Sequence, residues 1–126
     1  MVVYEVNLAV DADVAGAYAA WLGPHIDEVL AVPGFVSAEW WAVEADPAAP
    51  PAGGRVRWCV QYRVESRAAL QAYVDEHAER LRGDGLSRFG GRFEASRRVL
   101  VPEPARPGGA RPGGRAGPGT PHRATA

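Results

Sequence analysis

Two histidines and one tyrosine are the side chains of this sequence best suited to move protons. His25 and His77 each fall on the apolar side of a segment with helical spacing, and Tyr62 falls on the apolar side of an alternating segment. A histidine near its ordinary pKa of about 6.5 can act as a general acid or base near neutral pH. We therefore predict His25, His77 and Tyr62 as candidate catalytic residues, suited to abstraction of an acidic C–H or phenolic proton.

Aromatic residues on the same apolar faces predict a pocket around these three side chains. If both helical segments cover one face of a sheet, the pocket walls contain Tyr18, Trp58, Tyr73 and Phe89. A structural role stays open, because aromatic residues at such spacing often form a core and a buried histidine can be satisfied by hydrogen bonds. A cavity of about 300 Å³ or more lined by both histidines would favour ligand binding, and a collapsed, dry core would favour the structural role.

The elements that must position these residues follow from the spacing of apolar side chains. Alternating apolar and polar residues predict four strands, at residues 2–10, 35–44, 55–64 and 93–101. Helical spacing predicts two helices between them. The order strand–helix–strand–strand–helix–strand predicts an α+β, ferredoxin-like fold, in which both helices cover one face of a four-stranded antiparallel sheet.

The ends of the two predicted helices depend on capping residues and on proline. Asp11 or Asp13 could cap the first helix, and Pro24 should kink or restart it because proline has no N–H to donate. Ser66 could cap the second helix, which should end near the Gly83–Gly85 segment.

The second face of the predicted sheet has no helix to cover it. It would carry Glu5, Asn7, Trp40, Arg57, Cys59, Gln61, Arg63 and Arg98. Opposed glutamate and arginine side chains could pair across a two-fold axis, so we predict a homodimer through this open sheet face. A solvated face with stray aromatic residues is the alternative.

Composition divides the chain at about residue 101. Residues 1–101 contain 10 Arg and 14 acidic residues, whereas residues 102–126 contain 4 Arg, one Glu, six Gly and six Pro. We predict a folded domain at 1–101 and a disordered Gly/Pro/Arg-rich tail at 102–126. The run RFGGRFEAS superficially resembles an RNA-binding motif, but it opens the last strand of an acidic domain, which argues against a nucleic-acid partner.

The sequence lacks the residues needed for a disulfide, a metal site or a membrane span. Cys59 is the only cysteine, which excludes an internal disulfide and a thiolate zinc site. The spacing offers two histidines but no full set of three or four metal ligands, so we predict no metal and no cofactor. No apolar run approaches the ~20 residues that span a bilayer, and we expect a cytoplasmic protein that does not bind membranes.

Four segments together resemble a known bacterial family: YEVNLAVDADV, HIDEVLAVPGFVSAEWW, VQYRVESRAALQAYVDEHAERLR and RFGGRFEASRRVL. The family is called domain of unknown function 4286, and the resemblance covers nearly all of residues 3–101. In fold only, it extends to the dimeric α/β-barrel group, which includes cofactor-independent monooxygenases, small isomerases, decarboxylases and haem-degrading enzymes. The resemblance therefore implies a fold, and it carries over no catalytic residue.

Two hypotheses for function follow. In the first, a dimeric barrel binds a small aromatic or polyketide-like molecule between sheet and helices, with cofactor-independent oxygenation or proton transfer as candidate chemistry. In the second, the protein is a non-enzymatic dimerisation or scaffold module with structural histidines. Whether the protein is an enzyme stays open between them.

Overall fold

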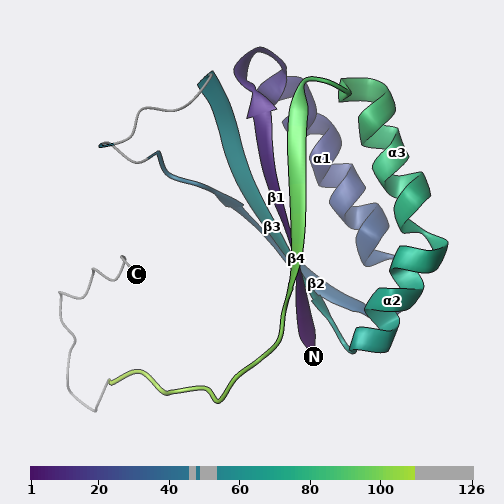
Figure 1. Ribbon diagram of the computed structural model, residues 1–126, viewed down its shortest axis with the longest axis vertical. Helices are drawn as coiled ribbons and strands as arrows, with labels where there is room; N and C mark the ends of the chain where they lie inside the picture. The colour runs from purple at the N-terminus through teal and green to yellow at the C-terminus, as the bar shows by residue number, and fades with distance from the viewer. Residues whose placement is uncertain (46–47, 49–53, 110–126) are drawn as a thin grey trace.

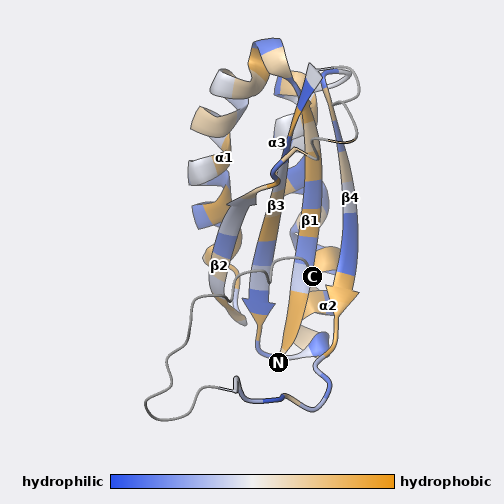
Figure 2. Ribbon diagram, turned by 90° about the vertical axis from the view of Figure 1, so that its left-hand side faces the viewer, coloured by the Kyte–Doolittle hydropathy of each residue, from blue (hydrophilic) through white to orange (hydrophobic). Residues whose placement is uncertain are grey.

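A computed structural model describes residues 1–45, 48 and 54–109 of the chain. One four-stranded antiparallel sheet is covered on one face by three α-helices (Figure 1). The elements are β1 (Val2–Asp11), a 3₁₀ turn (Ala12–Val14), α1 (Ala15–Leu30), β2 (Phe35–Ala42), β3 (Arg55–Val64), α2 (Arg67–Glu76), α3 (Ala78–Phe89) and β4 (Phe93–Leu100). The strands lie in the order β2-β3-β1-β4 (Figure 2), so the predicted ferredoxin-like fold is confirmed.

The core lies between the sheet and the helices. Tyr4 pairs with Tyr62 across β1 and β3, and Val6 pairs with Val60 on one side and Arg97 of β4 on the other. These residues share the helix-facing side of the sheet, because side chains alternate between faces along a strand. Most residues in this row are buried against α1 and α2, but Arg97 is charged and places a guanidinium beside an apolar core.

A β-bulge in β2 reverses the predicted positions of the two adjacent tryptophans. Phe35 pairs with Val64 and Ser37 pairs with Arg63, which leaves one extra residue in β2. Because a bulge shifts the side-chain alternation by one, Trp40 faces the helices and Trp41 faces the open side. The prediction that Trp40 lies on the open face was therefore wrong.

Trp40 instead packs edge-on against Trp58, with ring centroids 5.6 Å apart. Trp41, opposite Cys59 in the register, is 53% exposed. The open face thus keeps a tryptophan, but a different one from the residue predicted.

The second predicted helix is divided in two and is longer than predicted. His77 leaves helical geometry (φ −128°, ψ −28°), which ends α2 and starts α3 in a new direction. The chain then stays helical through Gly83 and Gly85 as far as Phe89, so the predicted end at these glycines was wrong. Glycine weakens a helix by only about 1 kcal/mol relative to alanine, which the contacts of α3 can offset.

The start of the first helix also differs from the prediction. Asp11 and Asp13 make no side-chain cap, because Asp11 accepts hydrogen bonds from Arg55 and Arg92, and Asp13 pairs with Arg92. The helix continues through Pro24 without a restart. Ser66 caps α2 as predicted, accepting a hydrogen bond of 3.0 Å from the Ala69 amide.

Two segments predicted to be irregular extend beyond the described residues. Of the connection between β2 and β3, residues 46–47 and 49–53 lie outside them, and so do residues 110–126 of the predicted tail. Residues 102–109 are exposed and belong to no helix or strand. Across the described ranges, no helix is long and apolar enough to cross a bilayer.

Candidate functional site

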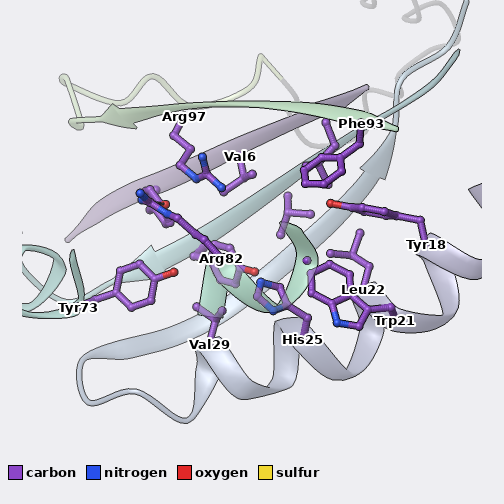
Figure 3. Close-up of a pocket in the computed structure, with 15 residues that line it drawn as sticks. Val6, Tyr18, Trp21, Leu22, His25, Val29, Tyr73, Arg82, Phe93 and Arg97 are labelled. Carbon is purple, nitrogen blue, oxygen red and sulfur yellow. Dashed lines mark hydrogen bonds between the residues drawn. The ribbon is translucent and has the colours of Figure 1, made fainter. Parts of the chain in front are cut away.

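A cavity of about 40 Å³ lies between the helix-facing side of the sheet and the helices (Figure 3). Every strand except β2 and all three α-helices contribute to its walls. It is lined by Tyr4, Val6, Leu8, Tyr18, Trp21, Leu22, His25, Val29, Val60, Tyr62, Tyr73, Arg82, Gly85, Phe93 and Arg97. This volume holds about two or three water molecules, far below the roughly 300 Å³ that would favour ligand binding, and the lining contains His25 but not His77. The cavity therefore does not meet the condition predicted for a ligand pocket.

Four of the seven predicted site residues meet in this cavity: His25, Tyr62, Tyr18 and Tyr73. His25 extends from α1, and its ring stacks on that of Trp21 with a centroid distance of 4.4 Å. Its Nδ1 atom is buried and has no hydrogen-bond partner. Buried polar atoms are nearly always paired, so an unpaired one at a cavity wall indicates a place for a missing partner.

Burial also sets the charge of the His25 ring. Desolvation lowers the pKa of His25, and the nearby Glu28 and Asp84 carboxylates only partly oppose this effect. The ring is therefore neutral at neutral pH, and one of its nitrogens carries a free lone pair. His25 can accept a proton from a molecule in the cavity.

The tyrosines of the cavity serve as donors, not as bases. Burial raises the pKa of Tyr18 to about 12 and that of Tyr73 to about 12. Burial also raises the pKa of Tyr62, and the neighbouring tyrosines reinforce the effect. All three hydroxyls keep their protons at neutral pH, so the predicted catalytic residue Tyr62 can donate a hydrogen bond but cannot act as a general base.

Two arginines, Arg82 and Arg97, also line the cavity, although neither was predicted as a site residue. Arg82 of α3 donates from Nη2 to the Tyr4 hydroxyl at 2.8 Å, while its Nε is buried without a partner. Arg97 of β4 points from the sheet toward the cavity (Figure 3). The signal for Arg97 was present, because it interrupts the apolar row formed by Phe93, Ala95 and Val99.

His77 does not join His25. It lies at the break between α2 and α3, where its Nδ1 is 3.2 Å from Arg80 Nη2 and its Nε2 is 4.0 Å from the Glu76 carboxylate. Because the helix changes direction at this residue, the side chain leaves the apolar stripe from which its position was predicted. The two histidines do not share one pocket.

The remaining predicted pocket residues, Trp58 and Phe89, lie behind the lining. Phe89 packs on Tyr18 with ring centroids 5.0 Å apart, and Trp58 stacks on Tyr18 at 6.1 Å. Both support the wall without facing the cavity.

Gly85 of α3 makes room for the Trp21 ring, and this contact gives a testable pair of substitutions. A Cβ at position 85 would lie 2.8 Å from Trp21 Cη2. Trp21 cannot easily move, since its Nε1 donates to Asp84 at 2.8 Å and its other face stacks on His25. We expect Gly85→Ala to lower the free energy of unfolding by about 1 kcal/mol, the overpacking cost outweighing the gain in helix propensity.

Gly83 is the matched control for this substitution. It lies in the same helix, and a Cβ there would meet no atom within 4 Å. Gly83→Ala should raise the free energy of unfolding by about 0.5–1 kcal/mol in urea titrations. Equal responses at the two positions would mean that Gly85 is not needed for packing of Trp21.

The open face of the sheet has its own polar cluster, centred on Glu5. This carboxylate is 3% exposed and accepts hydrogen bonds from Asn7 (2.9 Å), Gln61 (2.9 Å) and Arg98 (2.5 Å). These bonds, that of Asn7 first, lower the pKa of Glu5 to about 2, although burial opposes them. Burial and the Glu5 charge raise the pKa of the Cys59 thiol, which is therefore a poor nucleophile.

No metal centre emerges from these side chains. The portion of the chain that the structure describes contains no group of three His, Cys, Asp or Glu side chains that could hold a metal ion.

A match to a known family model assigns this chain to a protein family. The family model described as a domain of unknown function (DUF4286) matches residues 1–102. The chain belongs to the DUF4286 family. No curated protein matches this DUF4286 chain in sequence.

Solved structures share the fold of the DUF4286 domain at low sequence identity. A putative antibiotic biosynthesis monooxygenase from Nitrosomonas europaea superposes with a TM-score of 0.59 and 14% identity, covering 81% of this chain and 98% of that one. SnoaB, a cofactor-independent oxygenase from Streptomyces nogalater, gives 0.58 and 9%, covering 85% and 98%. A de novo designed protein, Foldit4, gives 0.54 and 13%, covering 81% and 98%.

This likeness concerns the fold alone. Oxygenases and a designed protein match the DUF4286 domain about equally well. Function must therefore be argued from the side chains of the site.

Proposed function

We propose that this DUF4286 protein binds a small aromatic molecule in the cavity between sheet and helices, and that His25 accepts a proton from it. The observation that carries the proposal is the buried, unpaired Nδ1 of His25 at the wall of that cavity. A bound hydroxyl or acidic C–H would supply the missing partner. Stacked on Trp21 and neutral at neutral pH, the imidazole is oriented and ready to act as a base.

The surrounding side chains favour a planar ligand. Tyr18, Trp21 and Phe93 line the cavity beside His25, and aromatic walls of this kind pack well against a flat ring. The volume of about 40 Å³ favours a single small ring that extends toward the mouth over a fused polyketide skeleton. We therefore propose a single-ring aromatic ligand in place of the predicted polyketide-like one.

The finer part of the proposal is the fate of the anion left after proton transfer. Oxygenation without a cofactor, the chemistry of the oxygenase SnoaB, is one fate that such an anion can have. In that form of the proposal the ligand carbanion bonds to one atom of dioxygen, the O–O bond then breaks, and the second oxygen leaves as water, so that a CH2 group of the ligand is oxidised to a carbonyl. The protonated tyrosines donate hydrogen bonds to the oxyanion of the ligand. Proton transfer alone, as in an isomerisation, is the simpler form.

A thermal-shift screen of small phenols, hydroquinone and aromatic acids tests the proposal. A ligand at tenfold excess over its Kd should stabilise the folded protein by about 1.4 kcal/mol. We expect that shift in the unmodified protein and in His77→Ala, and its loss in His25→Ala. His77 is the matched control, because it is the same residue type and does not line the cavity.

Two outcomes would contradict the proposal. One is a ligand shift that survives in His25→Ala but disappears in His77→Ala, which would move the site to the break between α2 and α3. The other is no shift with any compound while His25→Ala is only less stable, which would make His25 a structural residue.

A second candidate function is homodimerisation through the open sheet face, without chemistry. Two observations favour it: the cavity is small, and Trp41 is 53% exposed on a face that no helix covers. An exposed tryptophan on an uncovered sheet face is a common anchor of protein interfaces. Dimerisation and ligand binding use opposite faces of the sheet, so one does not exclude the other.

A further inference from the structure

We infer that the ligand of this cavity is a carboxylate, held by the guanidinium groups of Arg82 and Arg97. The inference rests on the proposed function and names the chemical class of its ligand. It concerns the end of the cavity that His25 does not fill, where α3 and β4 face each other.

Unbalanced positive charge is the first argument. Two arginines line the cavity, and its lining contains no carboxylate. Within the described ranges, neither Arg82 nor Arg97 forms an ion pair. Most other arginines of the domain behave differently: Arg55, Arg92 and Arg98, for example, each contact a carboxylate. Arg57, Arg67 and Arg80 also form no ion pair in the described ranges, but of these unpaired arginines only Arg82 and Arg97 line the cavity. Arg82 is half-buried there, and a charge in such a place is usually paired.

A buried, unpaired donor of Arg82, a residue that lines the cavity, also favours a carboxylate. Arg82 Nη2 is held by the Tyr4 hydroxyl at 2.8 Å, and this bond orients the guanidinium. The Nε–H of the same group is buried and donates to nothing. Nε and a terminal nitrogen form the planar fork that matches the two oxygens of a carboxylate, so an oxygen placed at Nε would complete the arrangement.

The donors around the cavity point to the same chemistry. The hydroxyls of Tyr18 and Tyr73 stay protonated at neutral pH, because burial raises each pKa to about 12. Together with two guanidinium groups they offer many donors, whereas the acceptors are the neutral His25 ring and the tyrosine hydroxyls, of which that of Tyr4 already accepts from Arg82. A ligand that brings acceptor oxygens with negative charge satisfies such a site, whereas a neutral hydrocarbon ring leaves its donors unpaired.

The volume of the cavity and the exposure of Arg97 are both compatible with a small anionic group. A carboxylate has three non-hydrogen atoms, comparable with the two or three water molecules that a cavity of about 40 Å³ holds. Arg97 is exposed on β4, whereas Arg82 Nε is buried deeper. An incoming anion would therefore meet Arg97 first and then Arg82, while the rest of the ligand extends toward the mouth.

Calorimetric titration with benzoate and with benzamide tests the inference. These two probes have nearly the same shape but differ in charge. We expect benzoate to bind the full chain with a Kd of roughly 1 mM, as suits a fragment of its size, and benzamide to bind at least tenfold more weakly. Arg97→Gln should weaken benzoate at least tenfold and leave benzamide unchanged.

Arg63→Gln is the matched control, since it removes the same charge from the opposite face of the sheet. It should leave both titrations unchanged. Arg82→Gln is a second variant; because it also loses the Tyr4 bond, its fold is checked first by circular dichroism. Arg97 has no ion pair to lose among the described residues, so Arg97→Gln should fold normally.

The outcomes separate this inference from the proposed function. If benzamide binds as tightly as benzoate and Arg97→Gln changes neither dissociation constant, the inference of a carboxylate ligand is wrong, although the cavity still binds an aromatic ring. If neither probe binds the unmodified protein, both the inference and the proposed function fail. If Arg63→Gln weakens benzoate as much as Arg97→Gln does, the effect comes from net charge and the proposed site is wrong.

Discussion

Replacing Glu5 with glutamine is expected to lower the free energy of unfolding by about 2 kcal/mol at neutral pH. The carboxylate is almost fully buried, and three donors converge on it from Asn7, Gln61 and Arg98. Glutamine has one acceptor oxygen, and its amide group would set two donors face to face. The loss should appear in urea unfolding as a lower midpoint with an unchanged slope.

Glu39→Gln is the control for this substitution. Glu39 lies on the same face, but its contact with Arg63 is 3.8 Å long and both side chains are about half-exposed. Such a surface pair contributes little, so the control should change stability by less than about 0.5 kcal/mol. Equal losses at Glu5 and Glu39 would contradict the account of a buried carboxylate held by three donors.

The same carboxylate should shape the response to acid. Hydrogen bonds from Asn7, Gln61 and Arg98 lower its pKa from 4.5 to about 2 on folding. Between these values the unfolded chain binds the proton more readily, so the stability that Glu5 contributes is present above about pH 4.5 and is lost as the pH falls toward 2. Glu5→Gln should remove this part of the acid dependence, which a comparison of unfolding curves from pH 2 to pH 7 would reveal.

Replacing Trp41 with glutamate is expected to raise the dissociation constant of the proposed homodimer by about 30-fold or more. A buried interface tryptophan commonly contributes 2 kcal/mol or more to binding, and 1.4 kcal/mol corresponds to a factor of ten. Trp41 is suited to this role because it is 53% exposed in the single chain and lies on the uncovered face of β2. Sedimentation equilibrium over a range of concentrations measures the change.

Leu86→Glu is the control for Trp41→Glu. Leu86 is 59% exposed on α3, on the helical side of the molecule. This substitution introduces the same charge in place of an equally exposed apolar residue and should leave the dimer unchanged. A protein that stays monomeric at high micromolar concentration, or a dimer that only Leu86→Glu weakens, would contradict an interface at the open sheet face.

The fold could be predicted from the sequence because its strands alternate clearly and its helices carry an apolar stripe. The bulge in β2 could not, since one extra residue between Phe35 and Ser37 depends on how β2 pairs with β3. A single shift of this kind exchanged the faces of Trp40 and Trp41. The break at His77 was equally hidden, because Leu70, Tyr73 and Leu81 keep helical spacing across it.

The candidate site was only partly predictable. His25, Tyr18, Tyr62 and Tyr73 could be placed together because each lies on a regular apolar face. The predicted position of His77 in the pocket assumed one straight helix, whereas the helix breaks at this residue. Arg82 lies on α3 beyond the break, and its contact with Tyr4 joins residues 78 positions apart. The local spacing of apolar residues could not indicate that Arg82 lines the cavity.

The proposed function requires that a ligand bind against the His25 ring in the cavity between sheet and helices. An NMR titration of ¹⁵N-labelled histidine rings with 4-hydroxybenzoate, which carries a hydroxyl for His25 as well as a carboxylate, tests this requirement, with resonances assigned from His25→Ala and His77→Ala. We expect a saturable shift of the His25 ring nitrogens and an unchanged His77 ring. A shift confined to His77, or saturation of neither ring, would contradict it.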